Sequence, residues 1–121
     1  MKYALLIYSE EVDPATVDPA DGERIMGEYA AFTQSISERG INKAGEALHP
    51  TEAATSVRVR NGETVTTDGP FAETKEALGG FDIVDVADLD AAIAVAAELP
   101  GSWYGTVEIR PVWEWETDYA G

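Results

Sequence analysis

The segment 68–81, with the sequence DGPFAETKEALGGF, constrains the fold more than any other part of the chain. It begins with an acid and places three glycines, a proline and two aromatic residues between two segments that have strand composition. Pro70 fixes its own φ angle and disfavours helical geometry at Gly69, so the strand that ends at Asp68 must turn away sharply. The double glycine at 79–80 allows backbone or a ligand to approach closely. This corner is therefore either the wall of a small cleft or a tight turn with a solvated acid.

A helix pattern follows the first strand pattern. Residues 2–9 are an apolar run that is too short for an ordinary helix, which predicts a central strand buried on both faces. Asp18 and Pro19 are the residue types preferred at the N-cap and the first helical position. Gly40 is placed to end this helix in a left-handed conformation. Between them, apolar residues recur at helical spacing: Ile25, Tyr29, Phe32 and Ile36.

The middle of the chain predicts short strands and a hairpin. Residues 41–48 have the pattern of a short strand. Residues 55–60 and 64–68 flank Asn61-Gly62, a pair typical of two-residue hairpin turns. Valine and arginine alternate over residues 57–60, so we expect one face of the hairpin to be solvated.

The last third of the chain predicts a helix between two strands. Residues 80–86 have strand composition, and Asp88 is placed to cap a helix that Pro100-Gly101 ends. Apolar and charged residues alternate over 106–115, which predicts a strand with one covered face. Pro111 favours an edge position or a bulge for this strand, because proline cannot donate a ladder hydrogen bond.

These elements predict a single α+β domain over residues 1–121. Their order corresponds to a ferredoxin-like βαββαβ sandwich with an extra β-hairpin, in which helices cover one face of an antiparallel sheet. The other face then needs a partner, and a second copy packed face to face would make a homodimer. Trp113 and Trp115 either contribute area to that interface or lie over the protomer's own core.

The composition excludes several classes of function. A net charge of −15, from 23 acidic and 8 basic residues, argues against a nucleic-acid partner, which is bound through Lys and Arg. The acids are scattered, which fits either solubility alone or a salty cytoplasm that screens their repulsion. The chain has no cysteine, no apolar run of the roughly 20 residues that a membrane span needs, and no signal-peptide pattern. We therefore expect a cytoplasmic protein with no membrane partner.

His49 is the only histidine. Imidazole titrates nearer neutrality than other side chains, so an acid–base mechanism would use it. If the corner meets the end of the second strand, Asp68 would lie within hydrogen-bond reach of His49 and orient its ring. The alternative is a half-exposed loop histidine with no catalytic role.

Other side chains are candidates for ligand binding. Glu73 is a second polar group of the corner, and Tyr8 at a strand end would offer its hydroxyl to a cleft. Arg110 either holds a carboxylate or phosphate with its guanidinium fork or makes a structural ion pair near Glu108. Gly69, Pro70 and Phe71 would form the wall of the cleft. With one histidine, no cysteine and no glycine-rich phosphate loop, we expect no metal and no cofactor.

The corner sequence DGPFAETKE with LGGF resembles the signature of the YCII-related proteins, specifically their DGPF-domain branch. The opening MKYALLIY and the later GEALHP, VRVR and VEIRPV agree in order, so the resemblance covers residues 1 to about 113. It implies a ferredoxin-like fold, a dimeric α/β barrel and an active site suspected to use a His and Asp pair. Asp68 matches the motif directly. The family's histidine lies near the first helix, and residues 18–40 contain none, so the resemblance does not assign His49.

Two hypotheses of function follow. The first, which we favour, is a protein that binds a small organic ligand or acts in regulation. The resemblance implies a regulatory link to a sigma factor, because genes of DGPF-domain relatives often lie beside genes for extracytoplasmic-class sigma factors. The second is a cofactor-free isomerase, lactone-converting enzyme or hydrolase, with Asp68 and His49 as acid and base and Arg110 as an anion anchor.

Overall fold

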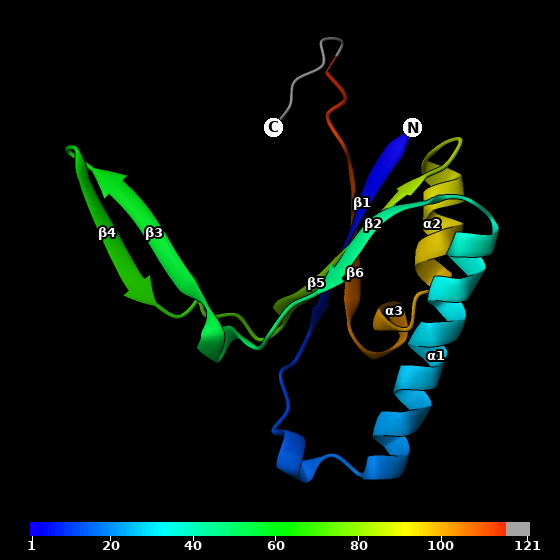
Figure 1. The fold of residues 1–121 in the computed structure, drawn as a ribbon, viewed down its shortest axis with the longest axis horizontal. Helices are drawn as coiled ribbons and strands as arrows, with labels where there is room; N and C mark the ends of the chain where they lie inside the picture. Colours follow the sequence, from blue (N-terminus) through cyan, green and yellow to red (C-terminus); the bar gives the residue numbers. More distant parts are fainter. Residues whose placement is uncertain (116–121) are drawn as a thin grey trace.

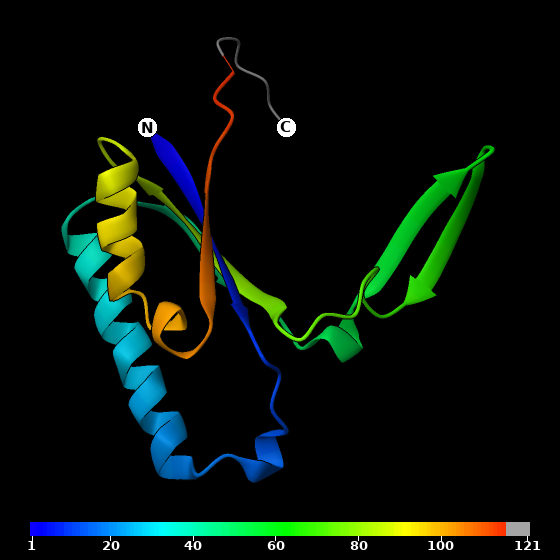
Figure 2. The same ribbon diagram turned by 180° about the vertical axis from the view of Figure 1, so that it is seen from behind.

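The computed structural model describes residues 1–115 and contains a four-stranded antiparallel sheet, a separate hairpin and three helices (Figures 1 and 2). The helices are α1 (Pro19–Glu38), α2 (Leu89–Glu98) and α3 (Gly101–Tyr104), with 3-10 turns η1 (Pro14–Thr16) and η2 (Thr51–Ala53). The strands are β1 (Lys2–Ser9), β2 (Asn42–Ala47), β3 (Thr55–Arg60), β4 (Glu63–Asp68), β5 (Ala77–Asp85) and β6 (Thr106–Pro111). None of the helices within 1–115 is both long and apolar enough to cross a membrane.

The sheet has the strand order β2-β5-β1-β6, and each neighbouring pair is antiparallel. The long helices α1 and α2 lie on the same face of this sheet, and the opposite face carries no helix (Figures 1 and 2). This is the order of a βαββαβ unit with a hairpin inserted between its second and third strands. The predicted α+β, ferredoxin-like fold is confirmed, and β6 is an edge strand, as its proline favours.

The helix boundaries follow the capping residues. The Asp18 carboxylate accepts a hydrogen bond from the amide of Ala20 at 2.9 Å, and Pro19 is the first helical residue of α1. Gly40 has a φ of 69°, in the left-handed region where glycine is favoured. The Asp88 carboxylate caps α2 by accepting from an amide of its first turn. These local signals therefore determine where α1 begins and ends and where α2 begins.

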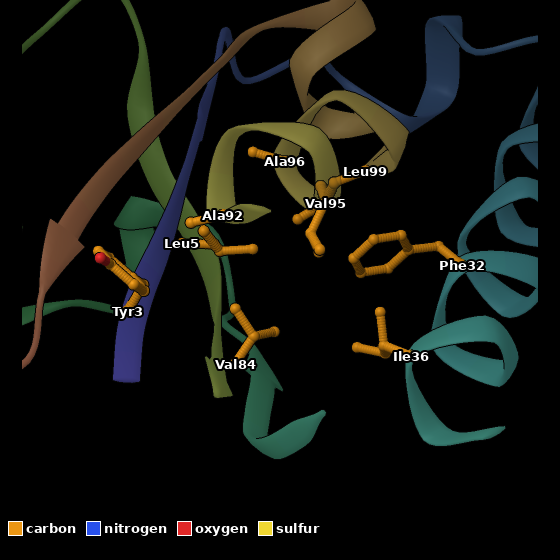
Figure 3. Close-up of a cluster of buried hydrophobic side chains, with 9 residues drawn as sticks. All are labelled: Tyr3, Leu5, Phe32, Ile36, Val84, Ala92, Val95, Ala96 and Leu99. Atoms are coloured by element: carbon orange, nitrogen blue, oxygen red, sulfur yellow. The ribbon is translucent and has the colours of Figure 1, made fainter. Parts of the chain in front are cut away.

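The core lies between the sheet and the two long helices (Figure 3). Leu5 and Val84 project from the sheet toward Phe32 and Ile36 of α1, and Tyr3 of β1 is also buried, with 3% of its surface exposed. The remaining buried side chains belong to α2 and the residue after it: Ala92, Val95, Ala96 and Leu99. The expectation that strand 2–9 is buried on both faces is corrected. Only its helix-facing residues are fully buried, because the other side of the sheet is not covered.

The hairpin β3–β4 is separate from the main sheet and extends away from it (Figures 1 and 2). Its turn residues Asn61 and Gly62 have φ angles of 53° and 78°, as a two-residue hairpin turn requires. Val57 is 59% exposed on one face and Val65 is 48% exposed on the other. The expectation of one solvated face is thus wrong for the single chain, in which both faces are open.

Two predicted strand boundaries also change. The strand predicted over 80–86 begins at Ala77 and includes both glycines. A Cβ atom on Gly80 would lie 2.9 Å from the Glu46 carbonyl oxygen, so the neighbouring backbone approaches there. The strand predicted over 106–115 ends at Pro111, which pairs with Tyr3 near the start of β1. One further bond follows, in which the Val112 amide donates to the Lys2 carbonyl at 2.9 Å.

Trp113 and Trp115 lie beyond the end of β6. They are 75% and 60% exposed, and their ring centroids are 5.6 Å apart. Neither ring covers the buried cluster of the protomer. Of the two placements considered for these rings, the core placement is therefore excluded.

Candidate functional site

A cleft of about 500 Å³ lies where the segment after β2 meets the segment before β5, and we call it the corner cleft. Its lining comes from three places: Tyr8 near the end of β1, the stretch from Leu48 to Ala54, and the stretch from Pro70 to Leu78. Most of these side chains are apolar, and His49 is the only lining histidine. The cleft thus lies at the corner that the glycine and proline pattern indicated.

Backbone geometry at Gly69 builds the corner. Its φ angle of 98° is in a region that side chains disfavour, and its amide donates to the Ala54 carbonyl at 2.7 Å. The Ser56 hydroxyl donates to the Gly69 carbonyl at 2.8 Å. These two bonds join the end of the hairpin to its beginning. Pro70 then directs the chain along the cleft.

The rim of the corner cleft is tied to the end of β1. The Glu11 carboxylate accepts from the Thr51 amide at 2.8 Å and from the Thr51 hydroxyl. The hydroxyl and amide bonds lower the pKa of Glu11, because both stabilise its ionised form. Lys75 lies 3.4 Å from a Glu10 carboxylate oxygen in an exposed ion pair. Loops distant in sequence are therefore held together around the cleft.

Several apolar side chains that line the corner cleft are unusually exposed. Phe71 is 81% exposed, Leu48 46% and Leu78 38%. An exposed aromatic ring beside a concave apolar surface is typical of a site that a ligand or partner covers. The arrangement suits the apolar body of a small molecule, with the His49 imidazole available for one polar contact.

The structure places some of the predicted site residues in this cleft and others outside it. Tyr8, His49, Pro70 and Phe71 line it. Gly69 shapes the corner from outside the lining, and Glu73 lies in the exposed loop nearby.

Asp68 is the last residue of β4, is exposed, and pairs in register with Thr55. It is not among the lining residues, and no hydrogen bond or ion pair joins it to His49 within residues 1–115. The acid–base pair of Asp68 and His49 stays a prediction from sequence. Asp68 belongs to the two-stranded sheet of the hairpin, whereas His49 belongs to the loop after β2 that lines the cleft.

Arg110 lies on β6, away from the corner cleft. Its guanidinium pairs with the carboxylate of Glu108 on the same strand, with the Nε atom 3.1 Å from Oε2. This contact raises the pKa of Arg110, because the neighbouring negative charge favours the protonated form. Arg110 therefore makes the structural ion pair, the second of the two roles considered for it, and its partner is Glu108 itself.

A second cleft, of about 430 Å³, was not anticipated from the sequence, and we call it the sheet–helix cleft. It is bounded by α1 and by the β1, β2 and β5 strands, and Asp82 of β5 lines it. Burial raises the pKa of Asp82 to about 6. The sequence does contain a signal: Asp82 occupies the same strand face as Val84, which is fully buried. Within residues 1–115, no group of three or more His, Asp or Glu residues is arranged to hold a metal ion.

Comparison with known proteins gives concordant matches over nearly all of the chain. A family model described as the YCII-related domain matches residues 1–116. The uncharacterized protein R00369 of Rhizobium meliloti (strain 1021) is 39% identical over 114 residues, which span 93% of this chain and 92% of that protein. Both matches include the segments that form the two clefts.

Proposed function

The chain belongs to the YCII-related family, and we propose that it acts as a homodimer that binds a small organic molecule in the corner cleft. The observation that carries this proposal is the cleft itself. A volume of about 500 Å³ lies in the range of ligand sites, and its walls are mostly apolar with few polar groups. The exposed ring of Phe71 supports the same reading, because an aromatic side chain left in water is stabilised by a covering ligand.

The uncovered face of the sheet supports the homodimer. Leu6, Phe81 and Ile83 lie on the face opposite to the helices and are only half-buried. A two-stranded hairpin that packs on nothing is marginally stable in water, and β3–β4 is such a hairpin in the single chain. A second copy packed against this face would cover both features. A stable interface of this kind buries about 800 Å² on each partner.

The dimer and the ligand site are connected through the sheet. Tyr8 of β1 and Leu78 of β5 are opposite each other and therefore share one face. This is the face that also carries Leu6, and both Tyr8 and Leu78 line the corner cleft. A second copy on that face would border the cleft and exclude water from a bound ligand. Ligand affinity and dimer formation are therefore expected to depend on each other.

The alternative function is cofactor-free acid–base catalysis, and one observation favours it. His49 lines a largely apolar cleft next to the hydroxyl-bearing Tyr8. Proton transfer needs a base within hydrogen-bond reach of a bound substrate. A substrate that is consumed by the native protein but not by His49→Gln would support catalysis. A ligand that both proteins bind and release unchanged would support binding.

Ligand-observed NMR with a library of small organic acids and neutral aromatic compounds tests the proposed site. Compounds that bind the native protein should lose most of their affinity for Phe71→Ala, because the ring lines the cleft. Met26→Ala is the matched control, since Met26 is 74% exposed on α1 and lies outside the cleft. Compounds that bind both variants equally well would refute this site.

Light scattering at micromolar concentration tests the assembly. The expected mass is twice the chain mass of 13.0 kDa. A mass of 13.0 kDa under these conditions would exclude the homodimer while leaving the ligand experiment to be judged by itself.

A further inference from the structure

We propose that the sheet–helix cleft is a second binding site, for a small organic amine whose ammonium group pairs with the carboxylate of Asp82. This site lies on the helix-facing side of the sheet, whereas the corner cleft adjoins the opposite side. The inference therefore goes beyond the proposed function and does not depend on it.

The strand register directs the Asp82 side chain under α1. In the antiparallel ladders Asp82 is opposite Leu5 of β1 and Gly45 of β2, so their side chains share one face. Leu5 is fully buried against the helices, which fixes that face as the inner one. A carboxyl group at this position is partly withdrawn from water, and this burial is the cause of its raised pKa.

Glycine at position 45 gives the carboxyl group its space. A Cβ atom on Gly45 would lie 2.3 Å from the Asp82 Oδ1 atom, which is too short for a non-bonded contact, so the carboxyl group would have to move. The neighbouring strand position therefore has to lack a side chain for the acid to occupy its present place. An acid at an inner sheet position, next to a glycine that leaves room for its carboxyl group, has the features of a built site rather than of ordinary core packing.

Asp82 has no cationic partner among the residues that the structure describes. Within residues 1–115 it makes no hydrogen bond or ion pair, and none of the residues lining the cleft is lysine or arginine. The two arginines of α1 and its C-cap have other partners, since Arg24 pairs with Asp21 and Arg39 pairs with Glu98. A desolvated carboxylate without a counter-charge is stabilised by a cation that enters the cleft.

The surroundings favour an organic ammonium ion over a metal ion. A divalent cation needs several carboxylate or carbonyl ligands, and Asp82 belongs to no such group within residues 1–115. The cleft instead offers the hydroxyls of Ser9 and Thr33 and the ring of Tyr29, together with the apolar side chain of Ile7. Hydroxyl oxygens accept from an ammonium group, and an aromatic face attracts it. The strongly acidic chain adds a long-range attraction for cations.

One other titratable side chain faces Asp82. Tyr29 projects from α1, and its pKa is raised by burial and then by the negative charge of Asp82. Glu46 of β2 lies next to Gly45 and therefore projects to the opposite face, while β1 contributes only Ile7 and Ser9. Amine binding should accordingly strengthen as the pH rises through about 6 and Asp82 ionises.

The test uses benzylammonium as the probe and benzyl alcohol as its uncharged counterpart. In amide-resolved NMR at neutral pH, benzylammonium should give saturable shifts at Gly45, Gly80 and Asp82, and benzyl alcohol should bind at least about tenfold more weakly. Equal binding of the two probes, or no saturable shift at these amides up to about 10 mM benzylammonium, would overturn the proposal.

Three variants separate the local contact from net charge. Asp82→Asn should weaken benzylammonium binding at least about tenfold. Glu23→Gln is the matched control: it removes one charge from an exposed position on α1 outside the cleft, and should leave binding within about twofold. Gly45→Ala keeps the charge but displaces the carboxyl group, and should also weaken binding. Affinity that is unchanged in folded Asp82→Asn, or lowered equally in Glu23→Gln, would contradict the assignment.

Discussion

Replacing Asp82 by asparagine should stabilise the protein at neutral pH. The substitution keeps the shape of the side chain and removes a charge that lies half-buried without a counter-charge. Burial raises the pKa of Asp82 from 3.8 to about 6. This difference corresponds to about 3 kcal/mol against the ionised form in the folded state. Because water reaches the carboxyl group from the cleft, we expect about 1–2 kcal/mol after screening.

The pH dependence gives the prediction its sign. The folded state holds the Asp82 proton more tightly than the unfolded chain, so it binds more protons between the two pKa values. The contribution of Asp82 to the free energy of unfolding therefore falls as the pH rises from about 4 to about 6, and the loss is complete above that window. The gain from Asp82→Asn should accordingly be small near pH 4 and reach its full size at neutral pH.

Urea denaturation between about pH 5 and pH 8 measures this effect. That range avoids the isoelectric region, since the sequence pI is about 4.1. The difference between variant and native protein should grow with pH, and its full size corresponds to a rise in melting temperature of about 3–8 °C. Glu23→Gln controls for the change in net charge and should give a nearly constant, small difference. A loss of stability in Asp82→Asn at neutral pH, or a gain that does not vary with pH, would refute this reasoning.

Three further predictions concern the corner and the charge of the chain. Gly69→Ala should destabilise the fold by about 1–3 kcal/mol, because Gly69 has a φ of 98°. Gly22→Ala is the control: Gly22 lies within α1 with nothing within 4 Å of an added Cβ atom, so this substitution should stabilise the fold by about 0.5–1 kcal/mol. Urea denaturation that ranks the two variants in the opposite order would contradict the corner geometry. Glu11→Ala should speed hydrogen exchange at the Thr51 amide, since it removes the carboxylate that accepts this bond at 2.8 Å. Unchanged protection would mean that this contact does not hold the rim. The net charge of −15 should make the melting temperature rise with added salt, and a temperature that stays flat from low to molar salt would show that self-repulsion is unimportant.

Features set by local signals were predictable from the sequence. Asp18 followed by Pro19 fixed the start of α1, and Asn61-Gly62 fixed the hairpin turn, because each acts on its own neighbours. The sharp turn at Gly69 was also predictable, since that residue adopts a conformation that few others allow, but the sequence left open whether the turn borders a cleft.

Features that depend on distant partners were not predictable in the same way. Alternation continues through Trp115, yet β6 stops at Pro111, close to the point where its neighbour β1 begins at Lys2. Asp68 ends the hairpin and His49 belongs to the loop that lines the corner cleft, so the direction in which the hairpin leaves the sheet decides whether the predicted pair forms. The environment of Asp82 depends on α1 above it and on Gly45 in another strand. Only the three-dimensional arrangement brings these groups together.

The most direct test of the proposed function is a crystal structure of the native protein soaked with the compounds that bind in the NMR experiment. We predict ligand density between Phe71, His49 and Tyr8, with a second copy of the chain packed on the face of the sheet that carries no helix. Density only at other places, with the corner cleft empty and the sheet face exposed to solvent, would contradict the account.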